Sequence, residues 1–582
     1  MDINGGDIIA SIFHKQGVRF VFTLCGGHIS PVLTGCKKHD IAVIDMRHEA
    51  SALFAADAAA RLTGVPGVAV VTAGPGVTNS ITAIKNAQMA QSPVVIIGGA
   101  AATVLKGRGS LQDIDQISMI RGIVKKAFTI KRNCDLVPVV EEAFISARSG
   151  VPGPVFIECP IDTLYAEKDV RAMYGVKSRS SRRHRLWNGL LDLYLRHHID
   201  RIFSCDFEEM KPHTLAIPAP TVKKNDIDKA IGLVRQASRP VMIIGSQALL
   251  YPHEADRLVV AVEATGIPVY FTGMARGLLG KSHALQFRHR RTRALNEADL
   301  VILAGMPCDF RLDYGLGINA DAVVVSINRS KRDLYLNIRP DVAVRTDPFL
   351  FLCALGNRIS ASDIRKDREE WFERLTADEK ERDGEIEAFS RIKTEYINPV
   401  VFLKKLESFL DERALLIADG GDFVGAASYI LRPRSPLSWL DPGVFGTLGV
   451  GGGFAVGAKL CRPDSEVWLL YGDGSAGYSI VEFDTLVRHN IPVIAVIGND
   501  AGWTQIARDQ VTYLGDDVAT GLRYSDYHRV ADALGARGLL LDREDRIDET
   551  LQEARALAGR GHPVLINVLI GKTDFRKGSI SV

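Results

Sequence analysis

The stretch from Val467 to Ala476 reads VWLLYGDGSA, an apolar, strand-like run that ends in a Gly-Asp-Gly turn. A second apolar run, from Val493 to Ile497, is followed by the residues GNDAG at 498–502. Runs of this kind are typical of parallel strands that are buried on both faces. Because the carboxyl ends of parallel strands meet at one edge of a sheet, Asp473 and Asp500 are expected to lie close together there.

Two carboxylates at such an edge predict a site for a diphosphate held by a metal ion. Asp473 and Asp500 would offer the oxygen ligands that Mg²⁺ prefers. Gly474 and Ser475 are small enough for backbone N–H groups to approach a phosphate at a helix N-terminus. Gly-Asp-Gly alone would indicate only a tight turn. The second strand with its own carboxylate favours the diphosphate site.

Apolar, β-branched runs alternate with helical patterns along most of the chain, for example at 68–71, 94–97, 241–244 and 300–303. This alternation predicts parallel α/β sheets. It breaks twice, in a stretch rich in Arg, Ser and His and in a highly charged stretch. We therefore expect three doubly wound parallel-sheet α/β domains at 1–168, 216–358 and 396–570, connectors at 169–215 and 359–395, and a tail at 571–582.

The composition places the chain in a broad class. Its 582 residues are 46% hydrophobic and 24% charged, with a net charge of +2, which is typical of a soluble globular protein and argues against a nucleic-acid partner. No apolar run has the roughly 18 residues of a membrane-spanning helix, and the N-terminus lacks a signal-peptide pattern. The eight cysteines, scattered without a Cys-x-x-Cys pair, indicate reduced core thiols. The sequence predicts a cytoplasmic protein.

The two strand ends resemble the thiamine-diphosphate enzymes of the acetolactate synthase group, whose pattern is Gly-Asp-Gly followed by Asn-Asn. The resemblance has several pieces and spans nearly the whole chain. It implies that Asp473, Asp500 and the backbone oxygen of Gly502 hold Mg²⁺ against the diphosphate of thiamine diphosphate. The chain departs from the family at Asp500, where the second Asn is expected. An additional negative charge there would tighten the metal and repel the diphosphate.

The first domain carries a second motif of the family, Arg-His-Glu at 47–49, before an Ala-rich helical stretch. The resemblance implies that Glu49 contacts the aminopyrimidine ring of the cofactor. A carboxylate hydrogen-bonded to the N1′ atom of that ring promotes the imino tautomer, which can take the proton from the thiazolium carbon. A lone Glu at a helix start would be a partner of the helix dipole. Beside the diphosphate site we expect Glu49 to be catalytic.

A third motif, GTLGVG at 446–451, is similar to the Gly-Thr-Met-Gly of the family. There a bulky apolar side chain lies under the cofactor and imposes its bent shape, a role that falls to Leu448. The stretch GGDF at 420–423 resembles the other diphosphate loop, with Asp422 where the family usually has Gln or Asn. The resemblance thus implies these further cofactor-binding residues: Gly26, Gly27, Gly421, Asp422, Phe423, Gly446, Gly474, Ser475 and Trp503.

Polar residues near the reactive face of the cofactor are expected to decide the reaction. His28 follows a Gly-Gly turn, and Gln112 stands in a Leu-Gln-Asp stretch similar to the Phe-Gln-Glu of the family. His28 could move a proton to or from a substrate hydroxyl. The alternative is a histidine bonded to a nearby carbonyl. Trp503 and Gln505 could shape the pocket, although a core tryptophan is equally consistent with the sequence.

The middle domain binds FAD in some relatives and ADP or a coenzyme A nucleotide in others. Here the apolar run at 322–327 is followed by Asn328 and Arg329. Dinucleotide folds usually place an acid at this position to bind ribose hydroxyls, and a basic residue where a ribose phosphate must fit. Asn328 and Arg329 therefore favour ADP or the 3′-phosphoadenosine of coenzyme A over FAD, with Arg276 as a second phosphate contact. The alternative is a solvated basic turn.

Over its full length the chain is most similar to the branch of this family that includes the 2-hydroxyacyl-CoA lyases, on the stretches 26–31, 86–93, 420–425 and 498–505. That likeness implies a lyase that splits a 2-hydroxyacyl-CoA into formyl-CoA and an aldehyde or ketone. The main alternative is an acetolactate synthase or another 2-keto acid carboligase that uses pyruvate. A catalytically silent scaffold at membranes and an NAD dehydrogenase are more distant alternatives.

The resemblance also bears on assembly. Family active sites form between the first domain of one subunit and the third domain of another, so a homodimer or homotetramer is implied. The stretch 183–203 predicts a basic amphipathic helix, which we expect to pack on its own or a neighbouring subunit, with membrane-surface contact as the alternative. The basic tail from Lys572 to Val582 is a candidate lid over the thioester.

Overall fold

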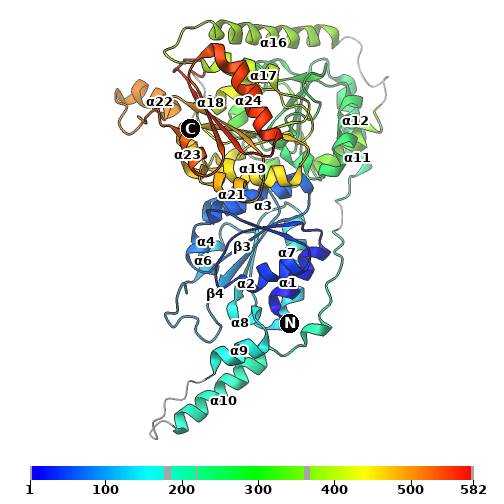
Figure 1. Cartoon of the computed structure of the whole chain (residues 1–582). Coiled ribbons are helices and arrows are strands. Elements are labelled where there is room, and N and C mark those ends of the chain that lie inside the picture. Colours follow the sequence, from blue (N-terminus) through cyan, green and yellow to red (C-terminus); the bar gives the residue numbers. More distant parts are fainter. Residues whose placement is uncertain (1–2, 176–184, 218–219, 360–367, 578–582) are drawn as a thin grey trace. The chain divides into compact units, whose positions relative to one another are not determined.

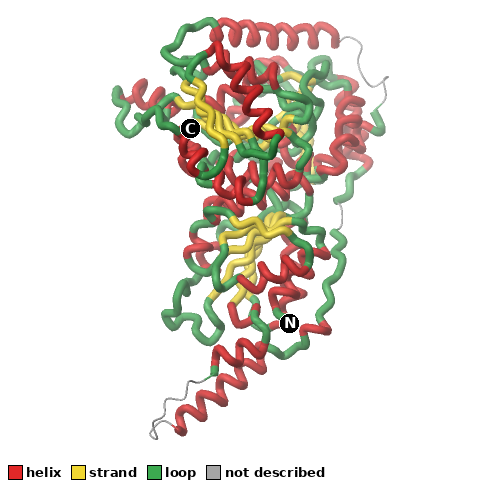
Figure 2. Tube along the Cα trace, viewed as in Figure 1, coloured by secondary structure: helices red, strands yellow, loops and turns green. Residues whose placement is uncertain are grey.

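The computed structural model describes residues 3–175, 185–217, 220–359 and 368–577. The chain forms two compact units. The first unit consists of residues 1–60 and 65–218, and the second of residues 61–64 and 219–582. Both contain six-stranded sheets of parallel strands that lie between helices (Figures 1 and 2).

The first unit contains one sheet with the strand order β2-β1-β3-β4-β6-β5, in which all neighbours pair in parallel. Its strands are β1 (Phe20–Leu24), β2 (Ala42–Asp45), β3 (Gly67–Val71), β4 (Val94–Ala100), β5 (Lys126–Thr129) and β6 (Val155–Pro160). Its helices are α1 (Gly5–Lys15), α2 (Ser30–Lys38), α3 (Glu49–Thr63), α4 (Pro75–Thr78), α5 (Ile81–Met89), α6 (Gln116–Ile120), α7 (Leu136–Arg148), α8 (Ile161–Leu164), α9 (Glu167–Tyr174) and α10 (Arg185–Ile202). The strands β3, β4 and β6 are buried along their whole length, which explains their continuous apolar sequences.

The second unit contains two such sheets. The central sheet has the order β12-β11-β10-β7-β8-β9, and the C-terminal sheet the order β14-β13-β15-β16-β18-β17. The central strands are β7 (Pro240–Ile244), β8 (Val269–Phe271), β9 (Gln286–Phe287), β10 (Leu300–Ala304), β11 (Val323–Asn328) and β12 (Val342–Arg345). The C-terminal strands are β13 (Ala414–Ala418), β14 (Trp439–Leu440), β15 (Glu466–Gly472), β16 (Ile494–Asn499), β17 (Arg537–Leu541) and β18 (Val564–Leu569).

Helices cover both of these sheets (Figure 2). With the central sheet lie α11 (Lys224–Gln236), α12 (Ala255–Thr265), α13 (Arg291–Glu297), α14 (Lys331–Leu334), α15 (Pro348–Gly356) and the long charged α16 (Glu369–Ser390). With the C-terminal sheet lie α17 (Pro399–Phe409), α18 (Asp422–Ile430), α19 (Val450–Cys461), α20 (Asp473–Ser479), α21 (Glu482–Arg488), α22 (Thr504–Leu514), α23 (Tyr527–Ala533) and α24 (Ile547–Gly559). Three parallel sheets, each with flanking helices, confirm the predicted α/β fold, while the domain limits stay predictions.

The helix predicted at 183–203 corresponds to α10. Ile199 and Ile202 are buried, whereas Leu190, Leu193 and Tyr194 on the same helix are exposed. None of the helices in the described parts of the chain combines the length and the apolar character that crossing a bilayer requires. The partner of the exposed apolar side chains therefore stays a prediction.

The prediction of reduced core thiols is wrong for Cys134, Cys205 and Cys25. Cys134 and Cys205 form a disulfide, and Cys25 is exposed. The backbone N–H of Cys205 donates to the Asn133 side chain, which in turn donates to the Cys205 carbonyl. These contacts bring together two cysteines 71 residues apart, a pairing that spacing alone does not indicate. Cys36, Cys159, Cys308 and Cys353 are buried free thiols, as predicted.

Candidate active site

The two sequence motifs that predicted a diphosphate site meet at the carboxyl edge of the C-terminal sheet. The strands β15 and β16 are neighbours, and their register pairs Gly472 with Gly498. Asp473 is therefore the first residue of α20 after one strand, and Asp500 directly follows the other. Parallel pairing of adjacent strands thus brings both carboxylates to one edge of the sheet.

Asp473 is held in place by backbone amides. Its side chain is 2% exposed, and its Oδ1 and Oδ2 atoms accept hydrogen bonds from the N–H groups of Gly474 (2.9 Å) and Gly502 (3.0 Å). Burial, and then the neighbouring charge of Asp500, raises the pKa of Asp473. Burial likewise raises the pKa of Asp500, and the charge of Asp422 adds to this effect.

Two buried carboxylates with raised pKa values fit a divalent cation, which would neutralise their repulsion. Within the described residues, no group of three or more His, Cys, Asp or Glu side chains is placed to hold a metal. A cation beside Asp473 and Asp500 would therefore need backbone, phosphate or water oxygens to complete its shell. Mg²⁺ is commonly bound in this way, through one or two carboxylates and substrate phosphates.

A cavity of about 540 Å³ lies at this edge and brings the predicted residues of the second unit together. It is lined by Arg276, Gly421, Asp422, Phe423, Gly446, Leu448, Asp473, Gly474, Ser475, Asp500, Gly502, Trp503 and Gln505, among others. The Ser475 hydroxyl donates to the carbonyls of Gly420 (2.9 Å) and Gly472 (3.1 Å), which fixes the turn into α20. These two hydrogen bonds hold the backbone of the turn in a fixed conformation, in which its N–H groups can contact a phosphate.

Close packing around the cavity explains several of its glycines. A Cβ atom on Gly420 would lie 2.2 Å from Leu448 Cδ2, and one on Gly474 would lie 2.5 Å from the Trp503 ring. Leu448 and Trp503 are thus held against backbone at two points of the wall.

Gly498→Ala is expected to lower the free energy of unfolding by about 1–3 kcal/mol, because the new methyl group would overpack the core. A Cβ atom there would lie 2.2 Å from the buried Phe423 ring. Chemical denaturation of the purified variant measures this effect. Gly477→Ala is the matched control, since it lies in α20 with open space around it and should be neutral or stabilising. Equal stability of the two variants would contradict the packing argument.

Asp419 is a site residue that the sequence analysis missed. It follows β13, and its carboxylate accepts hydrogen bonds from the N–H groups of Gly449 (2.9 Å) and Gly451 (2.7 Å) at the start of α19. Burial raises its pKa to about 7, although the amides of Gly451 and Gly449 oppose this shift. By binding the first turn of α19, Asp419 positions the loop that carries Leu448.

Asp422 has an unexpected partner. Its two carboxylate oxygens accept hydrogen bonds from Arg508 of α22, at 3.1 and 2.8 Å. This bidentate pair neutralises the acid that stands where the family has Gln or Asn. The tail after β18 lies nearby: Lys572 favours the ionised form of Asp500, and Phe575 is buried. The predicted lid lies partly outside the described residues, from 578 onward.

In the first unit, Glu49 begins α3 and is 4% exposed. Its Oε2 atom accepts a hydrogen bond from the Asn79 side chain at 3.0 Å. A Cβ atom on Gly76 would lie 3.6 Å from its Oε1 atom, so the segment after β3, at the start of α4, passes close to the carboxylate. Asn79 was not predicted, because nothing in the local sequence links it to a residue 30 positions away.

The remaining predicted residues of the first unit gather around the same loop. His28 Nδ1 lies 3.3 Å from Thr72 Oγ1, and burial lowers the pKa of His28. A Cβ atom on Gly26 would lie 2.5 Å from Thr72, whereas Gly27 has open space around it. Gln112 adopts a positive φ of 62°, and its carbonyl packs against Gly74.

Most polar atoms of the predicted nucleotide residues Asn328 and Arg329 have partners within the protein, but the buried Nδ2 atom of Asn328 has none among the described residues. Asn328 is fully buried, and its Oδ1 atom accepts hydrogen bonds from Gln247 (2.9 Å) and from the Ser330 N–H (2.8 Å). Arg329 forms an ion pair with the buried Asp347 and donates to the Tyr251 hydroxyl. Their predicted contact with a ligand stays a prediction.

Comparison with known proteins matches the chain to three domain models of thiamine pyrophosphate enzymes. Residues 3–119 match the N-terminal TPP binding domain of thiamine pyrophosphate enzymes, residues 227–355 the central domain, and residues 419–568 the C-terminal TPP binding domain. The chain is 48% identical over 586 residues to 2-hydroxyacyl-CoA lyase 2 of Danio rerio, covering 100% of this chain and 93% of that protein. It is 47% identical over 587 residues to the Homo sapiens protein of the same name, covering 100% and 92%. A probable acetolactate synthase of Mycobacterium bovis is 34% identical over 576 residues, covering 97% and 96%.

Proposed function

The chain belongs to the thiamine pyrophosphate enzyme family, and on this premise we propose that it is a 2-hydroxyacyl-CoA lyase, which cleaves a 2-hydroxyacyl-CoA into formyl-CoA and an aldehyde or ketone. The observation that carries the proposal is the 47–48% identity, over the full chain, to proteins named for this activity. Proteins named acetolactate synthase are more distant, at 34%. The acetolactate synthase alternative is therefore the weaker one.

The cofactors of the proposed reaction are thiamine diphosphate and Mg²⁺. When bound, thiamine diphosphate supplies an electron sink for cleavage of the bond beside the substrate carbonyl. Asp473, Asp500 and the carbonyl of Gly502 would hold Mg²⁺, and the backbone at Gly474 and Ser475 would contact the diphosphate. Gly446 and Leu448 would contact the pyrimidine ring. The buried acid pair and the 540 Å³ cavity support this assignment.

Two residues of the first unit would move protons. Glu49 would hold or release a proton at the N1′ atom of the pyrimidine ring, and its burial beside Asn79 keeps the carboxylate in one orientation. His28 would accept the proton of the substrate hydroxyl. Because burial lowers its pKa, His28 is neutral near pH 7, and the ring nitrogen that carries no proton can accept one. Gln112 would orient the substrate by hydrogen bonding.

Assembly and location belong to the same proposal. The resemblance supports a homodimer or homotetramer in which Glu49 of one subunit and Asp473 of another serve one cofactor. The cytoplasm remains the proposed compartment, although the Cys134–Cys205 disulfide argues for an oxidising one. ADP or coenzyme A is the proposed ligand of the central sheet, in preference to FAD.

Product analysis tests the proposed reaction. Purified protein is incubated with thiamine diphosphate, Mg²⁺ and either 2-hydroxyisobutyryl-CoA or pyruvate, and the products are identified by mass spectrometry. Formyl-CoA and acetone from the first substrate are expected. Acetolactate from pyruvate, without cleavage of the acyl-CoA, would instead establish the carboligase alternative.

The affinity for Mg²⁺ is expected to rise with pH. Since the pKa values of Asp473 and Asp500 are raised, the apo protein holds protons on this pair at pH values where free carboxyls are ionised, and Mg²⁺ must displace them. Each displaced proton would change the affinity by about tenfold per pH unit until both groups are ionised. Calorimetric titration at pH 6 and pH 8 measures this difference, and affinity independent of pH would contradict it.

A further inference from the structure

The 540 Å³ cavity at the carboxyl edge of the C-terminal sheet, called the cofactor cavity below, has an acidic wall. The described residues that line it include five aspartates, at positions 419, 422, 441, 473 and 500, and one basic residue, Arg276. A wall with one sign of charge repels ligands of the same sign. Because the diphosphate of the cofactor is negatively charged, it binds here only if these acids are offset.

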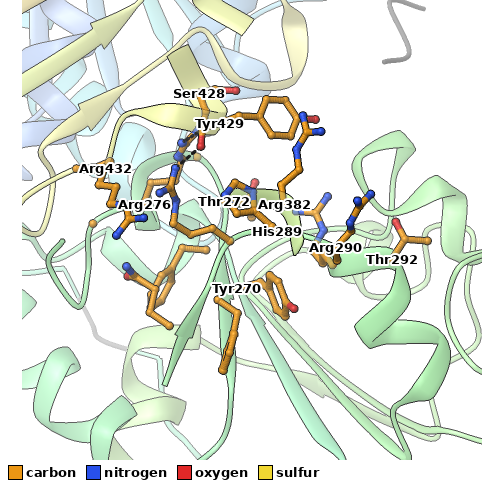
Figure 3. A pocket seen from close by; sticks show the side chains of 18 of the residues that line it. Tyr270, Thr272, Arg276, His289, Arg290, Thr292, Arg382, Ser428, Tyr429 and Arg432 are labelled. Atoms are coloured by element: carbon orange, nitrogen blue, oxygen red, sulfur yellow. Dashed lines mark hydrogen bonds between the residues drawn. The ribbon is translucent and has the colours of Figure 1, made fainter. Parts of the chain in front are cut away.

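Arg276 is committed to contacts within the protein. It donates to the Ser428 carbonyl at 2.5 Å (Figure 3), and its guanidinium lies 4.0 Å from the centroid of the Trp439 ring. It also lines a neighbouring cavity of about 640 Å³, in whose wall Arg288 and Arg432 lie. Those two arginines do not line the cofactor cavity. The balance of charge in the cofactor cavity therefore needs other partners.

Four of the five aspartates have such partners. Asp441 accepts hydrogen bonds from an indole N–H (2.8 Å) and a backbone N–H (2.9 Å), and Asp419 accepts two from backbone amides. Asp473 and Asp500 form the pair assigned to Mg²⁺, whose charge would offset theirs. Asp422 is the acid that remains.

Asp422 is balanced by an arginine from outside the cavity lining. Arg508 of α22 donates to both of its carboxylate oxygens, at 3.1 and 2.8 Å. The side chains of Arg508 and Asp422 are 15% and 14% exposed, so solvent screens this pair weakly. Burial opposes the charge of Arg508, but its hydrogen bond to Asp422 and then the charges of Asp422, Asp574 and Asp509 raise its pKa. Arg508 is therefore a permanent positive charge beside the cavity wall.

The charge of Asp422 is also felt at the metal pair. Burial raises the pKa of Asp500, and the charge of Asp422 adds to this rise. A buried acid that loses its partner disturbs its surroundings far more than one that is removed together with its partner. Loss of Arg508 alone should therefore disfavour an anion in the cavity, whereas loss of both residues should not.

We propose that Arg508 sets the affinity of the cofactor cavity for a diphosphate group by cancelling the charge of Asp422. This inference rests on the assignment of thiamine diphosphate to this cavity and is independent of the substrate. The pair also ties the start of α18 to α22. A purely mechanical tie would be lost equally when either residue is replaced, whereas cancellation of charge predicts opposite effects of the two replacements.

Calorimetric titration of thiamine diphosphate into the Mg²⁺-saturated protein tests this difference. Arg508→Gln leaves Asp422 unpaired and should weaken the affinity by about 10- to 100-fold. Asp422→Asn leaves Arg508 without its acid and should bind at least as tightly as the wild type. The double variant should return to within about threefold of the wild type. Arg508→Lys, which keeps the charge and loses the planar fork, should lie between Arg508→Gln and the wild type.

Two simpler ligands separate the effect of charge from that of loop geometry. Inorganic diphosphate with Mg²⁺ should give the same order of variants, because it carries the charge without the rings of the cofactor. Mg²⁺ alone should bind Arg508→Gln at least as tightly as the wild type, since an unpaired Asp422 attracts a cation. Equal losses of affinity for the cation and the anion would indicate a distorted site and overturn the proposal.

Arg555→Gln is the matched control. Arg555 of α24 forms the same kind of bidentate pair with Glu466, at 2.7 and 2.9 Å, at the amino end of β15, and neither residue lines the cofactor cavity. This variant should keep the wild-type affinity for thiamine diphosphate. Weaker binding in Asp422→Asn, or no recovery in the double variant, would overturn the proposal. These two variants decide the question even if Arg508→Gln alone fails to fold, because neither leaves an acid unpaired.

The titrations also separate this inference from the proposals beside it. A wild-type protein that does not bind thiamine diphosphate would refute the cofactor site and this inference with it. Binding to the wild type with no loss in Arg508→Gln would refute the role of Arg508 alone. The expected order of affinities in a protein that forms no formyl-CoA would refute the lyase and keep the role of Arg508.

Discussion

Glu49→Gln is expected to lower kcat by about 10²- to 10⁴-fold, the usual contribution of one positioned acid–base group. Gln has the shape of Glu and can still accept the hydrogen bond from Asn79, so the fold of the first unit should be preserved. It cannot exchange a proton with the pyrimidine ring. Formyl-CoA production, followed by mass spectrometry under single-turnover conditions, measures the loss.

The control for this variant is Glu167→Gln in α9, an exposed glutamate that is paired with Arg171. It removes the same charge from the same unit and should keep full activity. Thermal unfolding and the affinity for thiamine diphosphate should match the wild type in both variants. A Glu49→Gln enzyme with more than a tenth of the wild-type kcat would show that Glu49 has no acid–base role.

Asp473→Asn is expected to lower the affinity for Mg²⁺ and thiamine diphosphate by about 10²- to 10⁴-fold, and activity at fixed cofactor concentration should fall with it. The substitution removes one negative charge from the buried pair. It also turns an amide N–H₂ group toward the N–H of Gly474 or Gly502, which are both donors. Calorimetric titration of each cofactor measures the effect.

Asp500→Asn is the variant to compare with Asp473→Asn. It restores the Asn-Asn pattern of the family and removes the charge that opposes ionisation of Asp473. We therefore expect it to bind thiamine diphosphate at least as tightly as the wild type and to remain active. A collapse of cofactor binding in Asp500→Asn, as severe as in Asp473→Asn, would show that both acids are required ligands.

Local sequence was a good guide wherever a motif stood at the end of a strand. The turn at Asp473 and the segment at Asp500 lie together because β15 and β16 are adjacent and parallel, a relation that the two apolar runs already indicated. The resemblance to thiamine-diphosphate enzymes, which rested on these motifs, agrees with the three matched domains. The roles of the individual site residues stay predictions.

Contacts between distant segments were missed because no local pattern encodes them. Asp419 binds the start of α19 from 30 residues away, and Arg508 of α22 neutralises Asp422 across a separation of 86 residues. The disulfide between Cys134 and Cys205 depends on where the chain returns after α10. Each of these contacts joins segments that are far apart in the sequence.

By itself, the sequence determined the strand periodicity, the parallel α/β class and the small and acidic residues at the strand ends, because these depend on local hydrophobic pattern and backbone geometry. Only the tertiary structure decided which arginines share a cavity. Arg288 follows β9 of the central sheet, and Arg432 follows α18 beside the C-terminal sheet. Nothing in the local sequence distinguishes either of them from an ordinary surface arginine. Packing of the two sheets places them in the wall of one cavity, while the acids of α16 pair with Arg290 and Arg293.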